Sequence, residues 1–590
     1  MSGVMGKTTS DVLDYRKKDR NKFIKTLIQV AILVVLGVML YNAVFDWKKY
    51  EEPNKASWTN DKGFIAISYF GVGRSGTPKL VAKKQLDEQL QALYDQGYQT
   101  ISQQDILDFY KKKKPLPDKA LFLVFEDGRN DSSLFAQPLL EKYNFKATAL
   151  SYGNKMGNSE NKFLQPEDLK KMMENGFWEL GSNGYRLTYI NVFDDQGNFI
   201  GVKDESELTN KTKVGYYNHY LMDFIRDSNM IPIEDRSKME ARMNKDYKLM
   251  NDTYMDQLGF VPGAYMIMHA NTLYGGMNRL VADANDANIK KYFTMHFNRE
   301  GTAYNDSEGD LYDLTRVQPE PYWYTNHLLM RIQKDTDEKI RFARGDDEQA
   351  KEWDRLGGAA QFMEDQIVLT SPAAGSGMLY LKNSDSQKEI KLSAKLEGNV
   401  IGKQSIYLRY DREKGSFVRV VLHDNELRVE QKKEKGEVQE LFKTELSQVI
   451  WNPEDLTFDR ASVYTREQGE SGAPELEKYP INIKNTRPFE MTVQGDRLSV
   501  SVDKTPLLDK QQIDPSISSG GVALEAAYSE GNKKDDIYDG VFADVKIESL
   551  AQPNGEQQTL FSNVQTGLAG VVSSIKIAFS STMDWVIDTF

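Results

Sequence analysis

Two adjacent carboxylates follow an apolar stretch that reads as a buried strand. Glu126 and Asp127 come directly after the run ALFLVF and precede Gly128. Paired carboxylates can act as acid and base in glycoside hydrolysis, where they must lie on opposite sides of the scissile bond. Neighbouring residues of one strand point to opposite faces, which makes such a pair hard to build from these two. A hydrolase that uses Glu126 and Asp127 is therefore kept as an alternative only.

The composition excludes most other catalytic chemistry. The chain has 590 residues and no cysteine, so thiol nucleophiles, disulfides and Cys-bound zinc are ruled out. His219 and His269 each lack a second histidine three or four residues away, so we expect ordinary loop or core histidines and no metal. The net charge of -12 argues against nucleic acid as a partner, because nucleic-acid affinity depends on clustered Lys and Arg.

The elements that would position the two carboxylates alternate between strand and helix. GFIAISYFGV and ALFLVFEDG have the apolar character of short strands, whereas residues 86–98 have helical spacing. This alternation favours an α/β barrel with its working residues at the carboxyl ends of the strands. Beyond residue 361 apolar and polar residues alternate over many short stretches, which predicts a β-sandwich. The predicted fold class is multidomain, α/β plus all-β.

Residues 26–45 are uncharged and largely apolar. About 20 such residues suffice to cross a bilayer as a helix. Lys and Arg dominate the charges before this stretch, and Trp47 and Tyr50 stand just beyond it as interfacial aromatics. We expect an uncleaved, single-pass signal anchor in the cell membrane, with a cytoplasmic amino terminus and an extracellular remainder. A cleaved signal peptide is the alternative, but no small-residue cleavage site follows.

Composition and periodicity divide the chain into segments. A polar stretch interrupts the strand–helix alternation, and a highly charged stretch separates the two folded parts. Near the carboxyl terminus apolar residues recur every three or four positions, as in an amphipathic helix. The predicted segments are a basic tail 1–25, a transmembrane helix 26–45, a stalk 46–62, a barrel 63–335 with an insertion at 192–250, a linker 336–360, a sandwich 361–550 and an amphipathic helix 551–590.

Several stretches within residues 63–190 resemble a known family. GFIAISYFGVGRSGTP, GYQTIS, KKPLPDKA, LFLVFEDG and KYNFKATA are similar, in order and spacing, to the polysaccharide deacetylase (NodB-homology, carbohydrate esterase 4) domain, particularly its biofilm-polysaccharide branch. The later LYDLTRV fits the close of that domain. The resemblance implies a (β/α) barrel and a divalent metal, usually zinc, held by one Asp and two His. A neighbouring Asp would act as the general base toward metal-bound water.

The residues that carry the family's chemistry are altered here. The family's T-F-D-D-G corresponds to V-F-E-D-G, which places Asp127 on the metal-binding Asp and Glu126 on the base. The family's H-S/T-x-x-H corresponds to N-G-Y-R-L, so Asn183 and Leu187 replace both histidines. Leucine cannot bind a metal, and a neutral amide oxygen competes poorly with water. The resemblance thus implies a degenerate member without zinc. A structural alternative for Asp127 is an ion pair with Arg186.

A deacetylase pocket without metal can still bind a glycan. Aromatic rings stack on sugar faces, and amides and charged groups bond to hydroxyls. For each aromatic candidate, packing in the core or on the surface is the alternative interpretation. The candidates for glycan binding are Tyr69, Asn183, Tyr185, Arg186, Tyr265, His269 and Trp323.

The predicted sandwich is similar to concanavalin-like and laminin-G-like jelly rolls. SIYLRYDREKGSFVRVVL, RPFEMTVQGDRLSVSVDKTPLL and YDGVFADVKIESL follow the cadence of that family. The resemblance implies carbohydrate binding or scaffolding. Four acidic residues near its end could form a calcium site, because calcium prefers oxygen ligands, or could be solvated loop acids. They are Asp535, Asp536, Asp539 and Asp544.

Together these features predict a membrane-anchored extracytoplasmic protein with a catalytically degenerate deacetylase domain. We expect it to bind polysaccharide in exopolysaccharide or biofilm-matrix synthesis, export or modification, without a cofactor. A membrane glycosyltransferase or polysaccharide synthase is the expected protein partner. An atypical active deacetylase or hydrolase that uses Glu126 and Asp127, and a structural envelope protein, are the alternatives.

Overall fold

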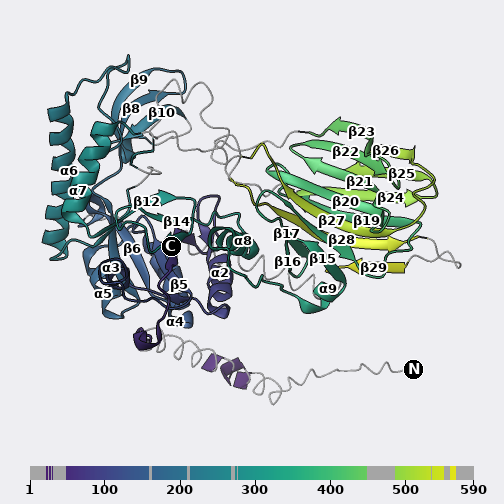
Figure 1. Ribbon diagram of the computed structural model, residues 1–590, viewed down its shortest axis with the longest axis horizontal. Helices are drawn as coiled ribbons and strands as arrows, with labels where there is room; N and C mark the ends of the chain where they lie inside the picture. Colours follow the sequence, from purple (N-terminus) through teal and green to yellow (C-terminus); the bar gives the residue numbers. More distant parts are fainter. Residues whose placement is uncertain are drawn as a thin grey trace, which may run out of the picture. The chain divides into compact units, whose positions relative to one another are not determined.

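The computed structural model describes residues 22–23, 25–27, 29–30, 48–157, 162–208, 213–267, 273–275, 277–447, 486–532, 535–550 and 558–565. The chain divides into two units, Met1–Tyr50 and Glu51–Phe590, and each is described by itself (Figure 1). Within the residues just given, no helix is long and apolar enough to cross a membrane. Most of residues 26–45 lie outside them, so the anchor stays a prediction.

The first folded part is a closed barrel. Parallel strands follow one another in the order β1 (Gly63–Tyr69), β5 (Ala120–Phe125), β6 (Ala147–Tyr152), β7 (Trp178–Gly184), β11 (Ala264–Tyr265), β12 (Met295–Glu300) and β14 (Leu314–Arg316). The ring closes where Val317, just after β14, pairs in parallel with Ile67 of β1. Short antiparallel β13 (Tyr304–Asp306) pairs with the start of β1, and β4 (Gln99–Thr100) pairs with β5.

Alternate strand residues fill the barrel interior. Phe122 of β5 stacks on Phe297 of β12 with ring centroids 5.2 Å apart, although these strands are not neighbours. Phe64, Phe122 and Val124 belong to one buried cluster with residues of β11, β12 and β14. Side chains two residues apart on a strand share a face. Residues in register with Phe122 and Val124 therefore point into the barrel.

Helices cover the outside of the barrel. They are α2 (Lys83–Asp95), α3 (Gln103–Lys112), α4 (Asn130–Tyr143), α5 (Pro166–Glu174), α6 (Arg236–Gln257), α7 (Arg279–Tyr292) and α8 (Thr325–Thr336). The sequence determines their limits locally. Ser102 and Asp105 form a capping box that starts α3, and Gly97, at a φ of 86°, follows α2 in the left-handed conformation. The predicted (β/α) barrel is thus present.

Two segment boundaries around the barrel differ from the prediction. The expected stalk 46–62 packs on the barrel from Glu51 onward: it contains the short helix η1 (Lys55–Ser57), Trp58 lies in the barrel core, and Asn60 pairs with Leu116. Trp58 is the reason, because an indole that can reach an apolar cluster is buried in preference to solvent exposure.

The predicted insertion at 192–250 is also misplaced. An antiparallel sheet of β10 (Val214–His219), β8 (Thr188–Asp194) and β9 (Phe199–Asp204) forms it (Figure 1). This sheet starts at Thr188, before residue 192. Helix α6, predicted to be part of the insertion, instead packs on the barrel through a buried stripe of Met239, Met243, Tyr247, Met250 and Tyr254. The many charges of α6 obscured this stripe in the sequence.

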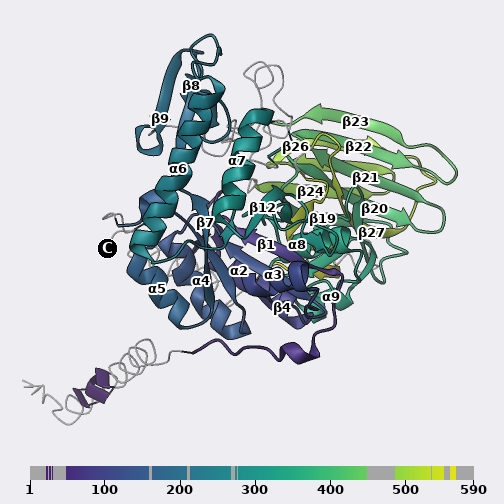
Figure 2. The same cartoon turned by 60° about the vertical axis from the view of Figure 1, so that its left-hand side comes forward.

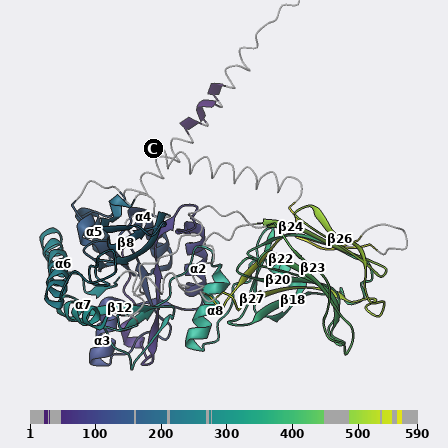
Figure 3. The ribbon, with the colours of Figure 1, turned by 90° about the horizontal axis from the view of Figure 1, so that it is seen from above.

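The second folded part is a sandwich of two antiparallel sheets. In the described residues, one sheet has the order β15 (Trp353–Gly357), β18 (Ser376–Leu381), β27 (Gly521–Tyr528), β20 (Gly402–Asp411), β21 (Ser416–His423), β22 (Glu426–Lys432) and β23 (Gln439–Glu445). The other has the order β16 (Ala359–Phe362), β17 (Gln366–Thr370), β28 (Asp539–Ser549), β19 (Ile390–Glu397), β24 (Thr486–Gln494), β25 (Arg497–Val502) and β26 (Thr505–Gln512). Figure 3 shows β24 and β26 in one layer and β20, β22 and β27 in the other.

Alternation places apolar residues of both sheets in a single core, which includes Leu524 of β27 and Phe542 of β28. The sandwich begins with β15 at Trp353 and is preceded by α9 (Asp347–Lys351). Helix α9 and strand β15 therefore lie within the predicted linker 336–360. Gln558–Ser562 form β29, which pairs with β28 where we expected the amphipathic helix 551–590. Residues 566–590 lie outside the described part of the chain.

Candidate functional site

Polar side chains gather at the carboxyl ends of three barrel strands, β5, β7 and β14. Glu126 follows β5 in register with Phe122 and Val124, so its side chain points into the barrel. Asp127 follows it, Asn183 lies at the end of β7, and Arg316 ends β14. The carboxyl ends of parallel barrel strands form one face, which in such folds carries the active site. The sequence placed the first three residues here and missed Arg316.

Arg316 neutralises Glu126 inside the barrel. Its Nε lies 3.4 Å from Glu126 Oε1, and the two side chains are only 5% and 1% exposed. The same guanidinium reaches Glu300 Oε2 at 3.3 Å and donates to the Arg299 carbonyl at 3.1 Å. In the sequence, Arg316 was noted only as part of LYDLTRV, the expected close of the barrel domain, and its partner is 190 residues away.

Asn183 links three strand ends. Its Oδ1 accepts a hydrogen bond from the Asp127 backbone N–H at 3.1 Å, and its Nδ2 donates to the Met266 carbonyl at 3.1 Å. The side chain is buried, and Asp127 and Gly128 form a tight turn with φ values of 69° and 62°. The amide thus joins β5, β7 and the segment after β11. Both ends of the amide group are engaged in this link.

The residues at this site do not fit a zinc ion. Zinc in such a site needs three nitrogen, sulfur or carboxylate ligands besides water. Asn183 is committed to its two backbone partners, and Leu187 has only carbon in its side chain. Among the described residues, no group of three or more His, Cys, Asp or Glu side chains is arranged to hold a metal. His269 lies outside the described residues.

Arg186 does not make the predicted ion pair with Asp127. Its Nε lies 3.0 Å from Asp246 Oδ1 on α6, and its guanidinium lies over the rings of Tyr185 and Tyr220 at 5.4 and 4.8 Å. Burial raises the pKa of Asp246 to about 6, although Arg186 opposes the shift. Helix α6 carries the competing carboxylate, and the prediction had assigned α6 to an insertion away from the barrel.

Tyr69 and Tyr265, both glycan-binding candidates, are core residues. Tyr69 is fully buried, stacks on Phe125 and donates to Gln89 Oε1 on α2 at 2.8 Å. Tyr265 is also fully buried and stacks on Phe293 at 4.3 Å. Both rings are on the helix-covered side of their strands, so neither can stack on a sugar.

Trp323 is 5% exposed and stacks on His327 at 4.2 Å, so it too is a packing residue. Tyr185 is half-buried beside Arg186 and is the candidate aromatic that keeps solvent access. His219 is buried in the antiparallel sheet against Tyr189 and Tyr217, with ring centroids 5.0 and 5.7 Å away, which agrees with the expected packing role.

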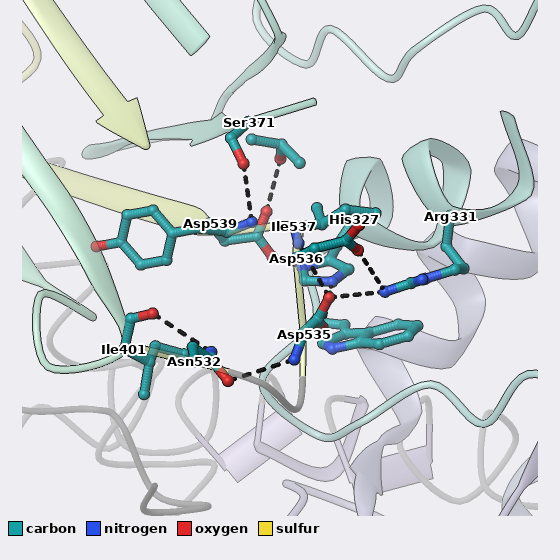
Figure 4. Close-up of polar contacts among 12 residues, drawn as sticks. His327, Arg331, Ser371, Ile401, Asn532, Asp535, Asp536, Ile537 and Asp539 are labelled. Carbon is teal, nitrogen blue, oxygen red and sulfur yellow. Dashed lines mark hydrogen bonds and ion pairs between the residues drawn. The ribbon is translucent and has the colours of Figure 1, made fainter. Parts of the chain in front are cut away.

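The acidic residues considered for calcium bind protein cations instead (Figure 4). Asp535 Oδ2 lies 2.8 Å from His327 Nε2, and Asp539 Oδ2 lies 3.0 Å from His327 Nδ1. Arg331 donates to Asp535 Oδ1 at 2.7 Å. Asp535 and Asp539 are 5% and 4% exposed, so they are not solvated loop acids either.

The other two acids also have protein partners: Asp536 pairs with Lys334 and Asp544 with Lys395, both at 2.6 Å.

His327 lies between two carboxylates. Burial disfavours its charged form, but Asp535 and Asp539 outweigh burial and raise the pKa of His327 to about 9. Both ring nitrogens then carry protons to donate. These contacts join α8 to the start of β28.

Part of the barrel is similar to a family of known proteins. The profile of the family described as polysaccharide deacetylase matches residues 113–222. A Bacillus subtilis (strain 168) protein, YxkH, whose name describes it as a candidate polysaccharide deacetylase, is 29% identical over 130 residues, which are 22% of this chain and 43% of that protein. A poly-beta-1,6-N-acetyl-D-glucosamine N-deacetylase of Staphylococcus aureus (strain N315) is 25% identical over 141 residues, 23% of this chain and 47% of that protein.

The chain therefore spans less than half of the length of these curated relatives. Among solved structures, a de-N-acetylase from Aggregatibacter actinomycetemcomitans is 18% identical, with a TM-score of 0.34. The match covers 45% of this chain and 98% of the de-N-acetylase chain. The family match and the relatives support a polysaccharide deacetylase domain in the barrel.

Proposed function

We propose that the barrel is a non-hydrolytic deacetylase domain that binds exopolysaccharide of the biofilm matrix. The observation that carries this proposal is the link that Asn183 makes between Asp127 and Met266. Asn183 stands where the family has a metal-binding histidine, and its amide group serves this structural link instead. The relatives named as poly-beta-1,6-N-acetyl-D-glucosamine N-deacetylases indicate an N-acetylglucosamine polymer as the polysaccharide.

The ion pair of Glu126 supports the same proposal. A general base must lie within hydrogen-bond reach of the water it activates. Glu126 is instead 1% exposed and directed at Arg316, and a buried carboxylate released from such a pair is strongly destabilised. The side chain in the family's base position therefore acts as a structural counter-ion. Tyr185 and Arg186, both partly exposed, are the residues we assign to glycan contact.

Location and partner complete the proposal. The uncharged stretch 26–45 is the proposed membrane anchor, which would place residues 51–590 outside the cell. A membrane glycosyltransferase that produces the polymer is the proposed partner. Such an assembly would let the barrel hold the nascent polysaccharide without modifying it.

Metal content and acetate release test the proposal. The purified full-length protein is analysed for zinc, nickel and cobalt and is incubated with β-1,6-linked N-acetylglucosamine oligomers, with an active deacetylase as positive control. We expect no stoichiometric metal and no acetate. A bound metal together with acetate release would overturn the proposal and favour an atypical deacetylase.

A variant sharpens this test. The triple substitution E126D, N183H and L187H restores the family's motif residues. Adding Arg316→Ala to this triple variant also removes the guanidinium that pairs with the carboxylate at position 126. Zinc binding by the triple variant but not by the parent would agree with the loss of the site through these positions. Equal zinc binding by both proteins would contradict it.

A further inference from the structure

A hollow of about 450 Å³, lined by both charged and apolar groups, lies on the outer face of the sandwich sheet that contains β20. It extends over β18, β27, β20, β21 and β22, which are successive strands of this sheet. Figure 2 shows β27, β20, β21 and β22 side by side. Its volume falls in the range of about 300–1,000 Å³ that is usual for small-ligand sites. It is far in sequence from the barrel residues discussed above, and no function has yet been assigned to it.

Strand alternation produces the floor of the hollow. On β20, Ile406 and Leu408 point into the core, so Ser405 and Tyr407 point outward. On β21, Val420 points inward and Val421 outward. Ser405 and Val421 are nevertheless only 3% and 5% exposed, because longer side chains on neighbouring strands surround them. Small residues at the centre of the sheet thus create a recess.

A charged network holds one wall of the recess rigidly. Tyr407 donates to Glu525 Oε2 at 2.8 Å, Arg419 Nη1 donates to the Tyr407 hydroxyl at 2.6 Å, and Arg419 Nε donates to Glu430 Oε2 at 2.6 Å. Four strands contribute these residues, and β20, β21 and β22 are neighbours. Groups that hold one another in place lose little conformational freedom when a ligand binds.

Two cations at the rim complete the hollow. Arg428 is 32% exposed; its Nε lies 3.2 Å from Glu426 Oε1 and its Nη1 lies 3.8 Å from Glu430 Oε1. Lys403, also at the rim, makes no ion pair within the described part of the chain. The lining therefore presents ammonium and guanidinium donors beside the carboxylates of Glu430 and Glu525, and Val421 and Tyr528 add apolar surface.

We propose that this hollow binds one hexose unit of a polysaccharide. Neighbouring hydroxyls of a sugar donate and accept at once, which matches carboxylates and cations placed side by side, and the C–H face of the ring matches the apolar surface. Glu430 and Glu525 would repel a phosphate group and so offset part of its attraction to Lys403, Arg419 and Arg428. The inference rests on the proposed function only for the choice of N-acetylglucosamine polymer as the first ligand to test.

Calorimetry on the full-length protein tests this site. The probes are β-1,6-linked N-acetylglucosamine oligomers, β-1,4-linked glucose oligomers and inorganic phosphate. Arg428→Ala removes a rim donor, and Glu525→Gln keeps the shape of the wall while removing its charge. Arg497→Ala, at a 52% exposed position on the other sheet, is the matched control. Circular dichroism checks that all variants are folded.

We expect oligosaccharide binding that is at least tenfold weaker in R428A and E525Q and unchanged in R497A. Three results would overturn the site: no oligosaccharide binds, only phosphate binds, or the pocket variants bind as tightly as the parent. Acetate is measured in the same samples. Acetate release would overturn the proposed role of the barrel, and the calorimetric comparison would still decide the sandwich site.

Discussion

Arg316 Nε lies 3.4 Å from Glu126 Oε1 in the interior of the barrel, where both side chains are almost completely buried. The pair joins β14 to the end of β5, across a separation of 190 residues. Removing one member of a buried pair leaves an uncompensated charge, whereas removing both does not. Each member therefore requires the other in the folded barrel, at the position where the family places its base.

The first prediction concerns that pair. Arg316→Met should lower the free energy of unfolding by about 3–5 kcal/mol, because Glu126 is then buried without a counter-ion. The double variant E126Q/R316M should recover most of the loss. Urea unfolding of the three proteins measures the difference, with Arg497→Ala as an exposed control that changes stability by less than about 0.5 kcal/mol. A single variant as stable as the parent would contradict the assigned role of Arg316.

The second prediction concerns the amide link. Asn183→Ala removes the partners of the Asp127 N–H and the Met266 carbonyl, and each buried group left unsatisfied costs about 1–3 kcal/mol. Two such groups give an expected loss of about 2–6 kcal/mol in the free energy of unfolding, measured by urea unfolding. Leu187→Ala is the control and should cost less, because the Leu187 side chain forms no hydrogen bond. If both variants lose the same amount, the link is not what Asn183 contributes.

The strands that carry the site could be predicted from local sequence, but their long-range partners could not. ALFLVF is confirmed as β5, and this placed Glu126 and Asp127 correctly at a strand end. Arg316 was missed because a buried ion pair between residues so far apart leaves no periodic signal. The acidic residues Asp535 and Asp539 were misinterpreted for the same reason, since their partner His327 lies on a different element.

Side-chain direction limited the choice of glycan-binding residues. Tyr69 is one residue after Ser68, and this single step turns its ring toward α2 instead of the barrel interior. Tyr265 faces Phe293 and the helices for the same reason. Aromatic character could be read from the sequence, whereas the face that each ring occupies depended on where each strand begins.

The third prediction is a loss of stability at alkaline pH through His327. Its pKa is raised from 6.5 to about 9, so its stabilising contribution is fully present below pH 6.5 and disappears as the pH rises through about 9. His327→Gln should be less stable than the parent at pH 6, and the difference should shrink by pH 10. Thermal unfolding across this range measures it. His423→Gln is the control. Burial lowers the pKa of His423, so this histidine does not titrate at alkaline pH, and the H423Q variant should lose stability at alkaline pH as the parent does.

The fourth prediction concerns Asp246, whose pKa burial raises from 3.8 to about 6. A carboxyl group with a raised pKa in the folded state destabilises the protein as it ionises, so its cost grows as the pH rises from about 4 to 6 and is complete above that. Relative to the parent, Asp246→Asn should gain on the order of 1–3 kcal/mol in free energy of unfolding between pH 4 and 7. Asp256→Asn, exposed on the same helix, is the matched control. Parallel stability curves for the parent and D246N would show that Arg186, 3.0 Å away, keeps Asp246 ionised throughout this range.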